Sequence, residues 1–398
     1  MKPTRSFILT LAALSLAVTA FAQSSKPASH QFLAYVGTYT TKTDSKGIYA
    51  LDFESETGKL TLRGVAAETP DPSWLALHPS GKYVYVANEA GKQSTISAFS
   101  LDAQTGKLAL LNKLPARGED PCHLSFDKSG KYLFVANYSS GNVVVFPILS
   151  NGKLGKSTSA LKDQGTLGPN TERQKAPHAH WIAISGTNRG AFVADLGLDR
   201  VLFYDFNASK GTLALHNATV SPKRPFAQNS LELKPASGPR HAAVGKFPDY
   251  RQFIYVLGEL DSTITAFATS KEGIFGLVQR VSTLPSGFSS RNDAAEIAIH
   301  PDGKWLFASN RGHDSIAVFQ IDPSTGFLTP SGHFPTGGKE PRHFALDPTG
   351  RFLLAENQNS NNIVVFRIDL ATGALQEVSR LDNLPSPVNL VFLPSPLH

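Results

Sequence analysis

The sequence contains a single cysteine, Cys122, among 398 residues. One thiol cannot form a disulfide within the chain, so the fold has to be stabilised by burial of apolar surface, which a chain of this length can supply. Runs of like charge are also missing, and the formal net charge is only +6. A basic stripe interleaved with aromatic residues, which nucleic-acid binding would need, is absent. The composition therefore argues against a nucleic-acid partner.

A long apolar run is found only near the N-terminus. Lys2 and Arg5 precede an apolar run from Phe7 to Ala20, which is shorter than the about 20 residues that span a bilayer. An A-x-A cleavage site ends at Ala22, so we expect residues 1–22 to be a secretory signal peptide and residues 23–31 a short tail. No cysteine follows the site to carry a lipid anchor. We expect a periplasmic or secreted protein that does not associate with the membrane after cleavage.

The rest of the chain repeats one pattern of short strands, with no competing helical period. In each unit an apolar strand leads into a turn such as HPSG or DPTG, a second strand ends near Ala-Asn, and a third ends in Phe. Clear copies begin at Pro72, Pro121, Ala294 and Pro341, and two less regular copies begin at Pro177 and Pro239. A period of about 45 to 60 residues built from strands is typical of a propeller, in which no repeat can bury its faces alone.

The two ends of the chain supply the strands of a seventh unit. Residues 35–40 match its second strand, residues 47–53 its third and residues 387–392 its first. Pairing between the last strand and the opening strands would close the ring and leave no free sheet edge there. We therefore predict an all-β, seven-bladed β-propeller, formed by residues 32–394 as one domain and closed by the N-terminal and C-terminal strands.

Polar side chains recur where the strands of such a ring meet one mouth of the axial channel. The first strand of each blade begins at the edge where the antiparallel second strand ends. Charged groups at this edge must be paired or face water. The residues expected there are His123, His178, His180, Arg240, His241, Glu259, Glu296, Arg311, Arg342 and His343. The alignment of the repeats sets His178 and Ala179 at the places of Arg240 and His241.

Convergence of these residues matters more than their type. A single histidine such as His123 or His343 is most simply interpreted as a structural residue whose hydrogen bonds are satisfied within the fold. Arg240, Glu259 and Arg311, however, bring opposite charges to one mouth from neighbouring blades, together with a histidine of the segment 177–180. This combination favours a functional site.

Five motifs extend the interpretation: PHAH at 177–180, GPRH at 238–241, GELDST at 258–263, SNRGHDSI at 309–316 and EPRHFALDPTG at 340–350. With these motifs the chain resembles the seven-bladed lactonase propeller family, which includes propeller-type 6-phosphogluconolactonases and the fungal carboxy-muconate cyclase. The resemblance covers nearly all of the mature chain. It implies a catalytic set of Arg240, Glu259, Arg311 and either His178 or His180, between which PHAH does not decide.

Such a set suits hydrolysis of a lactone, a carboxylic ester. Water attacks the carbonyl while a base, either Glu259 or the histidine, removes its proton, and fixed cations stabilise the oxyanion. Arg240 and Arg311 can bind that oxyanion, or a phosphate or carboxylate of the substrate. We expect a monomeric, 6-phosphogluconolactonase-like enzyme that acts on a sugar lactone without metal or other cofactor. The expected substrate-binding residues are His123, His241, Glu296, Arg342 and His343.

Several alternatives stay open. A zinc pair of His178 and His180, with His241 or Glu296 as third ligand, is disfavoured by the nearby arginines. A nucleophilic serine would need a G-x-S-x-G elbow, which the sequence lacks. A non-catalytic propeller that binds a protein or glycan would keep its binding residues on outer loops, and a cyclase would share the site. The phosphorylated sugar lactone is cytosolic, whereas this chain is expected to be exported, so the substrate remains open.

Overall fold

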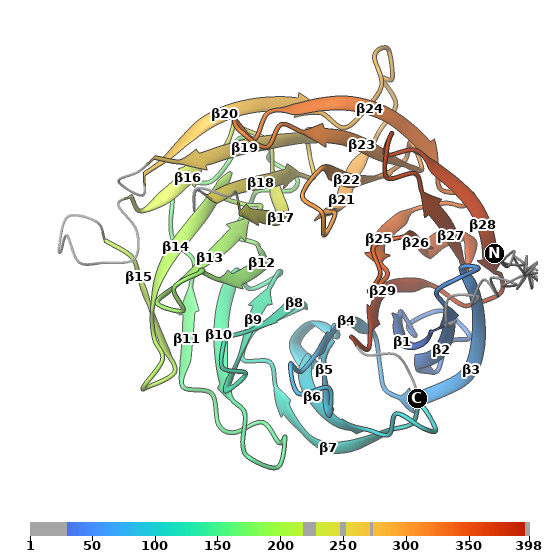
Figure 1. Ribbon diagram of the computed structural model, residues 1–398. Coiled ribbons are helices and arrows are strands. Elements are labelled where there is room, and N and C mark those ends of the chain that lie inside the picture. Colours follow the sequence, from blue (N-terminus) through green and yellow to red (C-terminus); the bar gives the residue numbers. More distant parts are fainter. Residues whose placement is uncertain (1–29, 218–227, 247–251, 271–273, 395–398) are drawn as a thin grey trace, which may run out of the picture.

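The computed structural model describes residues 30–217, 228–246, 252–270 and 274–394, which form a ring of seven antiparallel sheets around a central axis (Figure 1). The all-β, seven-bladed architecture is confirmed. The expected signal peptide, residues 1–22, and most of the expected tail lie outside the described residues. In the described ranges no helix is long and apolar enough to cross a membrane. In the same ranges the chain forms two short 3-10 turns, Gly91–Gln93 and Gln358–Ser360.

In blades 1 to 6 the strands follow chain order from the axis outward. We number the blades from the first one that is formed by a continuous stretch of the chain. Blade 1 contains β4 (Pro72–Leu77), β5 (Tyr83–Asn88), β6 (Thr95–Leu101) and β7 (Leu108–Pro115). Blade 2 contains β8 (Pro121–Phe126), β9 (Tyr132–Asn137), β10 (Asn142–Pro147) and β11 (Ser159–Lys162). Blade 3 contains β12 (Ala179–Ile184), β13 (Gly190–Asp195), β14 (Arg200–Asn207), β15 (Thr212–Leu215) and β16 (Ser230–Glu232). Its last two strands share one edge of β14.

The second half of the ring repeats the plan. Blade 4 contains β17 (Pro239–Lys246), β18 (Gln252–Gly258), β19 (Thr263–Thr269) and β20 (Phe275–Ser282). Blade 5 contains β21 (Asp293–Ile299), β22 (Trp305–Arg311), β23 (Ser315–Ile321) and β24 (Leu328–Pro335). Blade 6 contains β25 (Pro341–Leu346), β26 (Phe352–Asn357), β27 (Asn362–Ile368) and β28 (Leu375–Leu381).

Blade 7 joins the two ends of the chain. It contains β29 (Pro387–Phe392), β1 (Gln31–Thr38), β2 (Gly47–Glu54) and β3 (Lys59–Glu68). β29 pairs antiparallel with β1, with Ala34 opposite Phe392 and Gly37 opposite Asn389. The C-terminal strand is therefore innermost, and the predicted closure is confirmed.

The core consists of seven apolar clusters, one between each pair of neighbouring blades. Phe253 and Tyr255 of blade 4, for example, share a cluster with Leu306 and Phe319 of blade 5. Middle strands such as β10 are buried on both faces because each blade is covered on both sides. Their sequences are accordingly continuous apolar runs rather than alternating ones.

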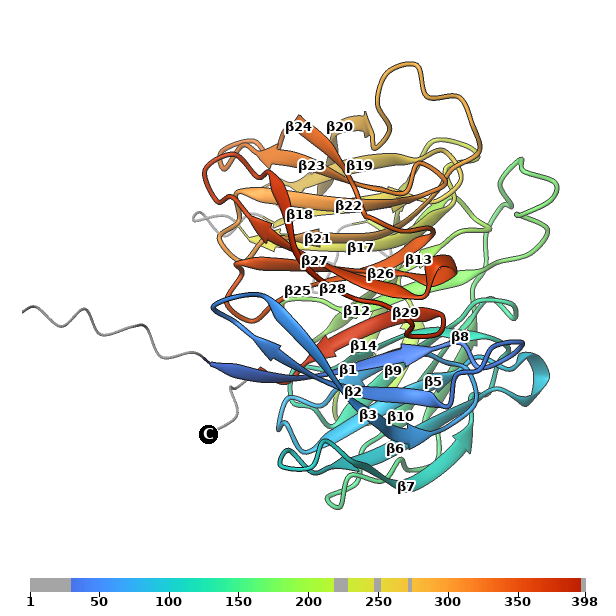
Figure 2. The same ribbon diagram turned by 90° about the vertical axis from the view of Figure 1, so that its right-hand side faces the viewer.

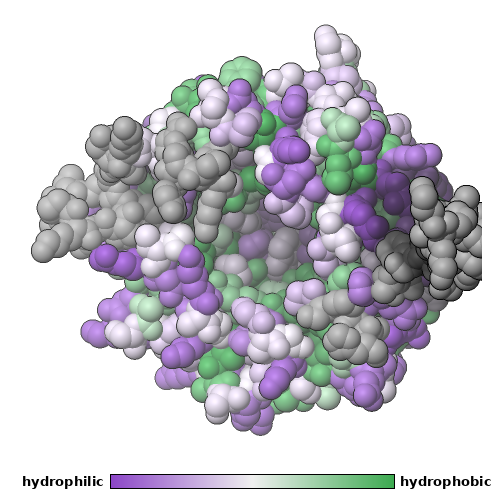
Figure 3. Space-filling view, in the orientation of Figure 1, coloured by the Kyte–Doolittle hydropathy of each residue, from purple (hydrophilic) through white to green (hydrophobic). Residues whose placement is uncertain are grey.

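The two faces of the ring differ. We call the face where the first strands begin and the second strands end the mouth face. The connections 163–178 and 283–292 project there, while both ends of the described chain lie at the opposite face (Figure 2). Seen from that opposite face, the centre of the ring is hollowed (Figure 3). The mouth face therefore carries these two long connections as well as the polar side chains expected from the sequence.

Candidate active site

A β-bulge near the start of the first strand of blades 1 to 6 positions the inner side chains. The register shifts between Pro239 and Ala242 in β17, and at the matching place in β4, β8, β12, β21 and β25. A bulge turns the local backbone and re-aims its side chains. Arg240 lies within the bulge of β17, next to Glu259, which follows β18.

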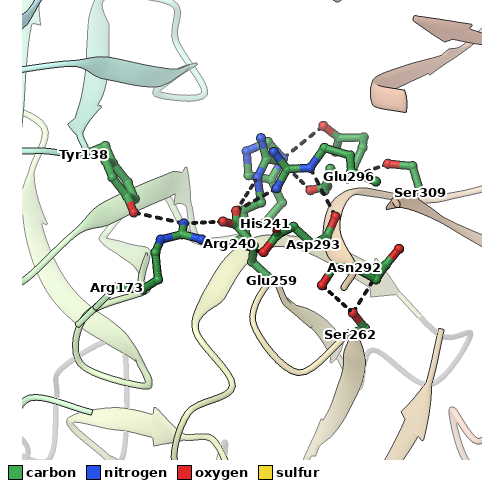
Figure 4. Close-up of polar contacts among 12 residues, drawn as sticks. Tyr138, Arg173, Arg240, His241, Glu259, Ser262, Asn292, Asp293, Glu296 and Ser309 are labelled. Carbon is green, nitrogen blue, oxygen red and sulfur yellow. Dashed lines mark hydrogen bonds and ion pairs between the residues drawn. The ribbon is translucent and has the colours of Figure 1, made fainter. Parts of the chain in front are cut away.

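Glu259 is the centre of a charge cluster at the mouth face (Figure 4). Its Oε2 lies 3.1 Å from Arg240 Nε and 3.1 Å from Arg311 Nη2, and its Oε1 accepts a hydrogen bond of 2.5 Å from Arg173 Nη2. Burial alone would raise the pKa of Glu259, but Arg311, Arg240 and Arg173 lower it to about 2. Glu259 is therefore an anion and a poor proton acceptor at neutral pH.

Glu259 does not satisfy all the hydrogen-bond donors of Arg240 and Arg311, the two arginines that come from the blades. Arg240 Nε and Arg311 Nη2 are buried, and neither has an aligned hydrogen bond, although both lie within ion-pair distance of the carboxylate. Arg240 Nη1 donates to the Ala295 carbonyl, and Arg311 Nε donates to the Asp293 carbonyl at 3.1 Å. Burial and the neighbouring cations lower the pKa of Arg240 to about 10, so it stays charged. The cluster thus has more positive charge than Glu259 compensates.

The two histidines of the segment 177–180 contact Tyr138 in different ways. The His178 ring stacks on Tyr138 with centroids 4.6 Å apart, and its Nδ1 lies 3.0 Å from the Tyr138 carbonyl oxygen. A carbonyl oxygen only accepts, so Nδ1 carries a proton here and Nε2 is the ring nitrogen left to accept one. His180 is buried, its ring meets Tyr138 edge-on, and burial together with Arg240 holds its pKa well below the usual range.

The alignment of His178 with Arg240 was wrong. Ala179 pairs with Asp195 as Pro239 pairs with Gly258, so His180 is the residue that occupies the place of Arg240. β12 begins at Ala179, two residues after Pro177, whereas β17 begins at Pro239 itself, so the register differs by two residues from the one that the motif suggests. His178 lies just outside the strand and donates its backbone N–H to Asp195 Oδ1 at 2.9 Å.

A second layer of predicted residues lies further along the first strands, inside the channel. His241 Nδ1 lies 3.0 Å from Glu296 Oε2, and His343 Nδ1 lies 2.7 Å from Glu356 Oε2. The rings of His123 and His241 are in edge-to-face contact at 5.3 Å. We call this group, completed by Trp74, the inner layer. Its members are almost fully buried except for Trp74, and they mainly contact one another.

Protonation in the inner layer follows from burial. Burial holds the pKa values of His123 and His241 well below the usual range and lowers that of His343 to about 4. Burial also raises the pKa values of Glu296 and Glu356. The histidines are therefore neutral at neutral pH. The inner layer therefore adds no positive charge to that of the arginine cluster above it.

Arg342 is a cation for which the described residues supply an aromatic ring but no ion pair. Its guanidinium carbon lies 5.4 Å from the centroid of the Tyr39 ring, whose hydroxyl donates to Glu89 Oε2 at 2.8 Å. Among the described residues its side chain has no ion pair or hydrogen bond. Burial lowers the pKa of Arg342, but Tyr39, Glu89 and Glu259 outweigh this and raise it. Its donors are free for a ligand.

Two cavities open beside these residues on the mouth face. One, of about 740 Å³, has a polar lining that includes Tyr39, Asp71, Glu89 and Gln358. The other, of about 440 Å³, is lined by residues that include Arg173, Asn292 and Asp293. Within the described part of the chain, no group of three or more His, Cys, Asp or Glu side chains is arranged to hold a metal ion.

Arg173 and Glu356 were missed by the sequence analysis. Arg173 lies in the connection 163–178, outside the repeated strands, so an alignment of blades cannot find it. Glu356 lies at the end of β26, where the equivalent residue of blade 1 is Ala87. A carboxyl group where other blades have alanine was a visible signal for a buried partner of His343.

Comparison with known proteins agrees with the fold and the motifs. The family model "Lactonase, 7-bladed beta-propeller" matches residues 33–392, and the chain belongs to this family. It is 34% identical over 315 residues to the 6-phosphogluconolactonase of Bacillus subtilis, covering 79% of this chain and 84% of the relative. It is 36% identical over 317 residues to the 6-phosphogluconolactonase of Formosa agariphila, covering 78% of this chain and 85% of the relative.

A solved structure extends the likeness to three dimensions. The periplasmic gluconolactonase of Pseudomonas aeruginosa superposes with a TM-score of 0.81 at 29% sequence identity. The superposition covers 91% of this chain and 99% of the other. The resemblance drawn from the five motifs is therefore confirmed.

Proposed function

We propose that this protein hydrolyses the ester bond of a sugar lactone at the mouth of the propeller, without a metal ion. The observation that carries the proposal is the excess of cations at one place. Arg240 and Arg311 keep donors that Glu259 does not use, and they lie in a mouth that also holds histidines. The names of the relatives, 6-phosphogluconolactonase and gluconolactonase, support the same reaction class.

His178 is the better candidate for the general base. Its Nδ1–H is held by the Tyr138 carbonyl, which leaves Nε2 as a proton acceptor. Burial depresses the pKa of His180 and the arginines depress that of Glu259, so both are poor proton acceptors at neutral pH. His180 is in ring contact with Tyr138 and His241, and its role in the proposal is to shape the site.

The reaction proceeds in two steps. A water oxygen attacks the lactone carbonyl carbon while His178 Nε2 takes the water proton, and Arg240 and Arg311 stabilise the oxyanion that forms. The carbonyl then reforms, the bond from carbon to ring oxygen breaks, and the imidazolium returns its proton to that oxygen. The product is a hydroxy acid. Glu259 orients the arginines and does not exchange a proton.

Arg342 and the 740 Å³ cavity are proposed to bind the rest of the substrate. The cavity lining offers hydroxyl, amide and carboxylate groups that match the hydroxyls of a sugar. The inner-layer residues His123, His241, Glu296 and His343 form the floor of the site. The A-x-A motif and the periplasmic relative support export of the mature chain.

Acid release from a panel of lactones tests the proposal. The panel contains δ-gluconolactone, corrected for its spontaneous hydrolysis, and its 6-phosphate. We expect Arg311→Ala to lower kcat/KM by about 100-fold, as for loss of one oxyanion donor. His178→Asn should lower it more than His180→Asn. Hydrolysis no faster than the spontaneous rate, or unchanged rates in both Arg311→Ala and Glu259→Gln, would overturn the proposal.

A further inference from the structure

We infer that Arg173 is a positioning residue of the candidate active site. It holds the Glu259 carboxylate in an orientation that leaves Arg240 and Arg311 with donors free for the oxyanion. This inference rests on the proposed function and adds a residue that lies outside the propeller repeat. Its support comes from the anchoring of Arg173, from its contacts and from the arrangement of charge around Glu259.

The backbone around Arg173 is fixed on both sides. Gln174 is buried, and its Nε2 donates to the Leu196 carbonyl and to Asp199 Oδ1, both at 2.8 Å. Asn170 Oδ1 accepts the backbone N–H of Arg173 at 3.0 Å. The connection 163–178 therefore presents Arg173 in a set position, so little ordering is needed when substrate binds.

The side chain of Arg173 joins three blades across the mouth. Its Nη2 donates to Glu259 Oε1 of blade 4 and to the Tyr138 hydroxyl of blade 2 at 3.2 Å (Figure 4). Its Nη1 lies 3.6 Å from Asp293 Oδ1 of blade 5. Although 31% of its side chain is exposed, all of these partners hold it against Glu259.

These contacts determine how Glu259 faces the other two arginines. With Oε1 bonded to Arg173, only Oε2 is turned toward Arg240 and Arg311, and neither of them gains an aligned hydrogen bond from it. Without Arg173 the carboxylate is free to rotate and to form stronger, two-oxygen pairs with the blade arginines. Their free donors would then be used within the protein. The chemical step should slow, while substrate binding at Arg342 should change little.

Arg173→Met tests this inference because it removes the charge and keeps most of the aliphatic stem. Arg291→Met is the matched control: Arg291 lines the same cavity and pairs with Asp293, but its side chain is 84% exposed and does not contact Glu259. We expect kcat to fall about 10- to 100-fold in Arg173→Met, with KM little changed, as for a mispositioned catalytic group. Arg291→Met should keep the parental kcat.

Two further variants separate positioning from folding. Tyr138→Phe removes one hydrogen bond of Arg173 and keeps the ring that stacks on His178, so it should lower kcat in the same direction by a smaller factor. In Arg173→Ala, added methylguanidinium should restore part of kcat, which a merely structural role would not allow. A crystal structure of Arg173→Met should show both Glu259 oxygens bonded to Arg240 and Arg311.

The outcomes can be told apart. If the parent enzyme is active and kcat is the same in Arg173→Met and Arg291→Met, the inference is wrong and the proposed function stands. A rise in KM alone would also overturn it. If the parent protein does not hydrolyse any lactone of the panel, the proposed function fails and this inference fails with it.

Discussion

Arg240 and Glu259 face each other at the mouth end of blade 4, with the arginine Nε 3.1 Å from the carboxylate Oε2. Their side chains are 4% and 5% exposed, so both charges are shielded from water. Removing one partner of a buried ion pair leaves the other charge uncompensated. At Glu259 this affects Arg173 and Arg311 as well, since the same carboxylate lies within ion-pair distance of all three cations.

Glu259→Gln should therefore lower stability as well as activity. We expect the free energy of unfolding at neutral pH to fall by about 3 kcal/mol or more, measured by urea denaturation. Glu172→Gln is the control, because Glu172 lines the 440 Å³ cavity together with Arg173 but is exposed. Equal stability of the two variants would show that Glu259 is not needed to hold the arginines together.

Arg342→Met should impair substrate binding rather than folding. The guanidinium has free donors and its charge is not paired within the described structure, so its loss breaks no ion pair there. We expect KM for the best lactone to rise about tenfold, the contribution of one hydrogen bond to a charged group. Arg351→Met, which removes a cation paired with Glu56, serves as control. An unchanged KM would remove Arg342 from the binding residues.

The buried histidines should make the protein sensitive to acid. His123, His180 and His241 have pKa values well below 6.5, chiefly because of burial. Below pH 6.5 the unfolded chain binds protons at these residues and the folded chain does not, so stability falls as the pH is lowered toward the folded pKa values. Each histidine contributes about 1.4 kcal/mol per pH unit over that window. Urea denaturation between about pH 7 and pH 5 should show that the free energy of unfolding falls less steeply with decreasing pH in His123→Asn than in the parent. Equal slopes in the two proteins would contradict this assignment.

Asp163 should respond to pH in the opposite direction. It is buried, accepts a 2.5 Å hydrogen bond from the Tyr204 hydroxyl, and burial and Asp195 raise its pKa well above 3.8. The folded chain therefore keeps a proton that the unfolded chain loses, and stability falls as the pH rises above 3.8 toward the folded pKa. Asp163→Asn should gain stability relative to the parent as the pH rises. The exposed Asp382→Asn should not, and a parallel response of both variants would contradict the prediction.

The repeat made the ring predictable from the sequence. Strand pattern and turns recur in six units, and the ends of the chain complete the seventh, so blade number and closure follow from counting. The cluster of Arg240, Glu259 and Arg311 was predictable for the same reason, because antiparallel pairing alone brings those positions to one face.

Other features depend on contacts that the repeat does not encode. The register of β12 decides between His178 and His180 at the place of Arg240, and a shift of two residues there cannot be read from PHAH. Arg173 reaches Glu259 from a connection whose path depends on the burial of Gln174.

The position of β29 has a consequence for how the molecule forms. The strand nearest the axis in blade 7 is synthesised after all the other described strands, so a nascent chain shorter than residue 387 cannot complete its circle. Until then β1 has an unpaired backbone edge, open to pairing with other chains. The ring therefore closes only after β29 has been made, and a chain truncated before residue 387 should be prone to aggregation and proteolysis.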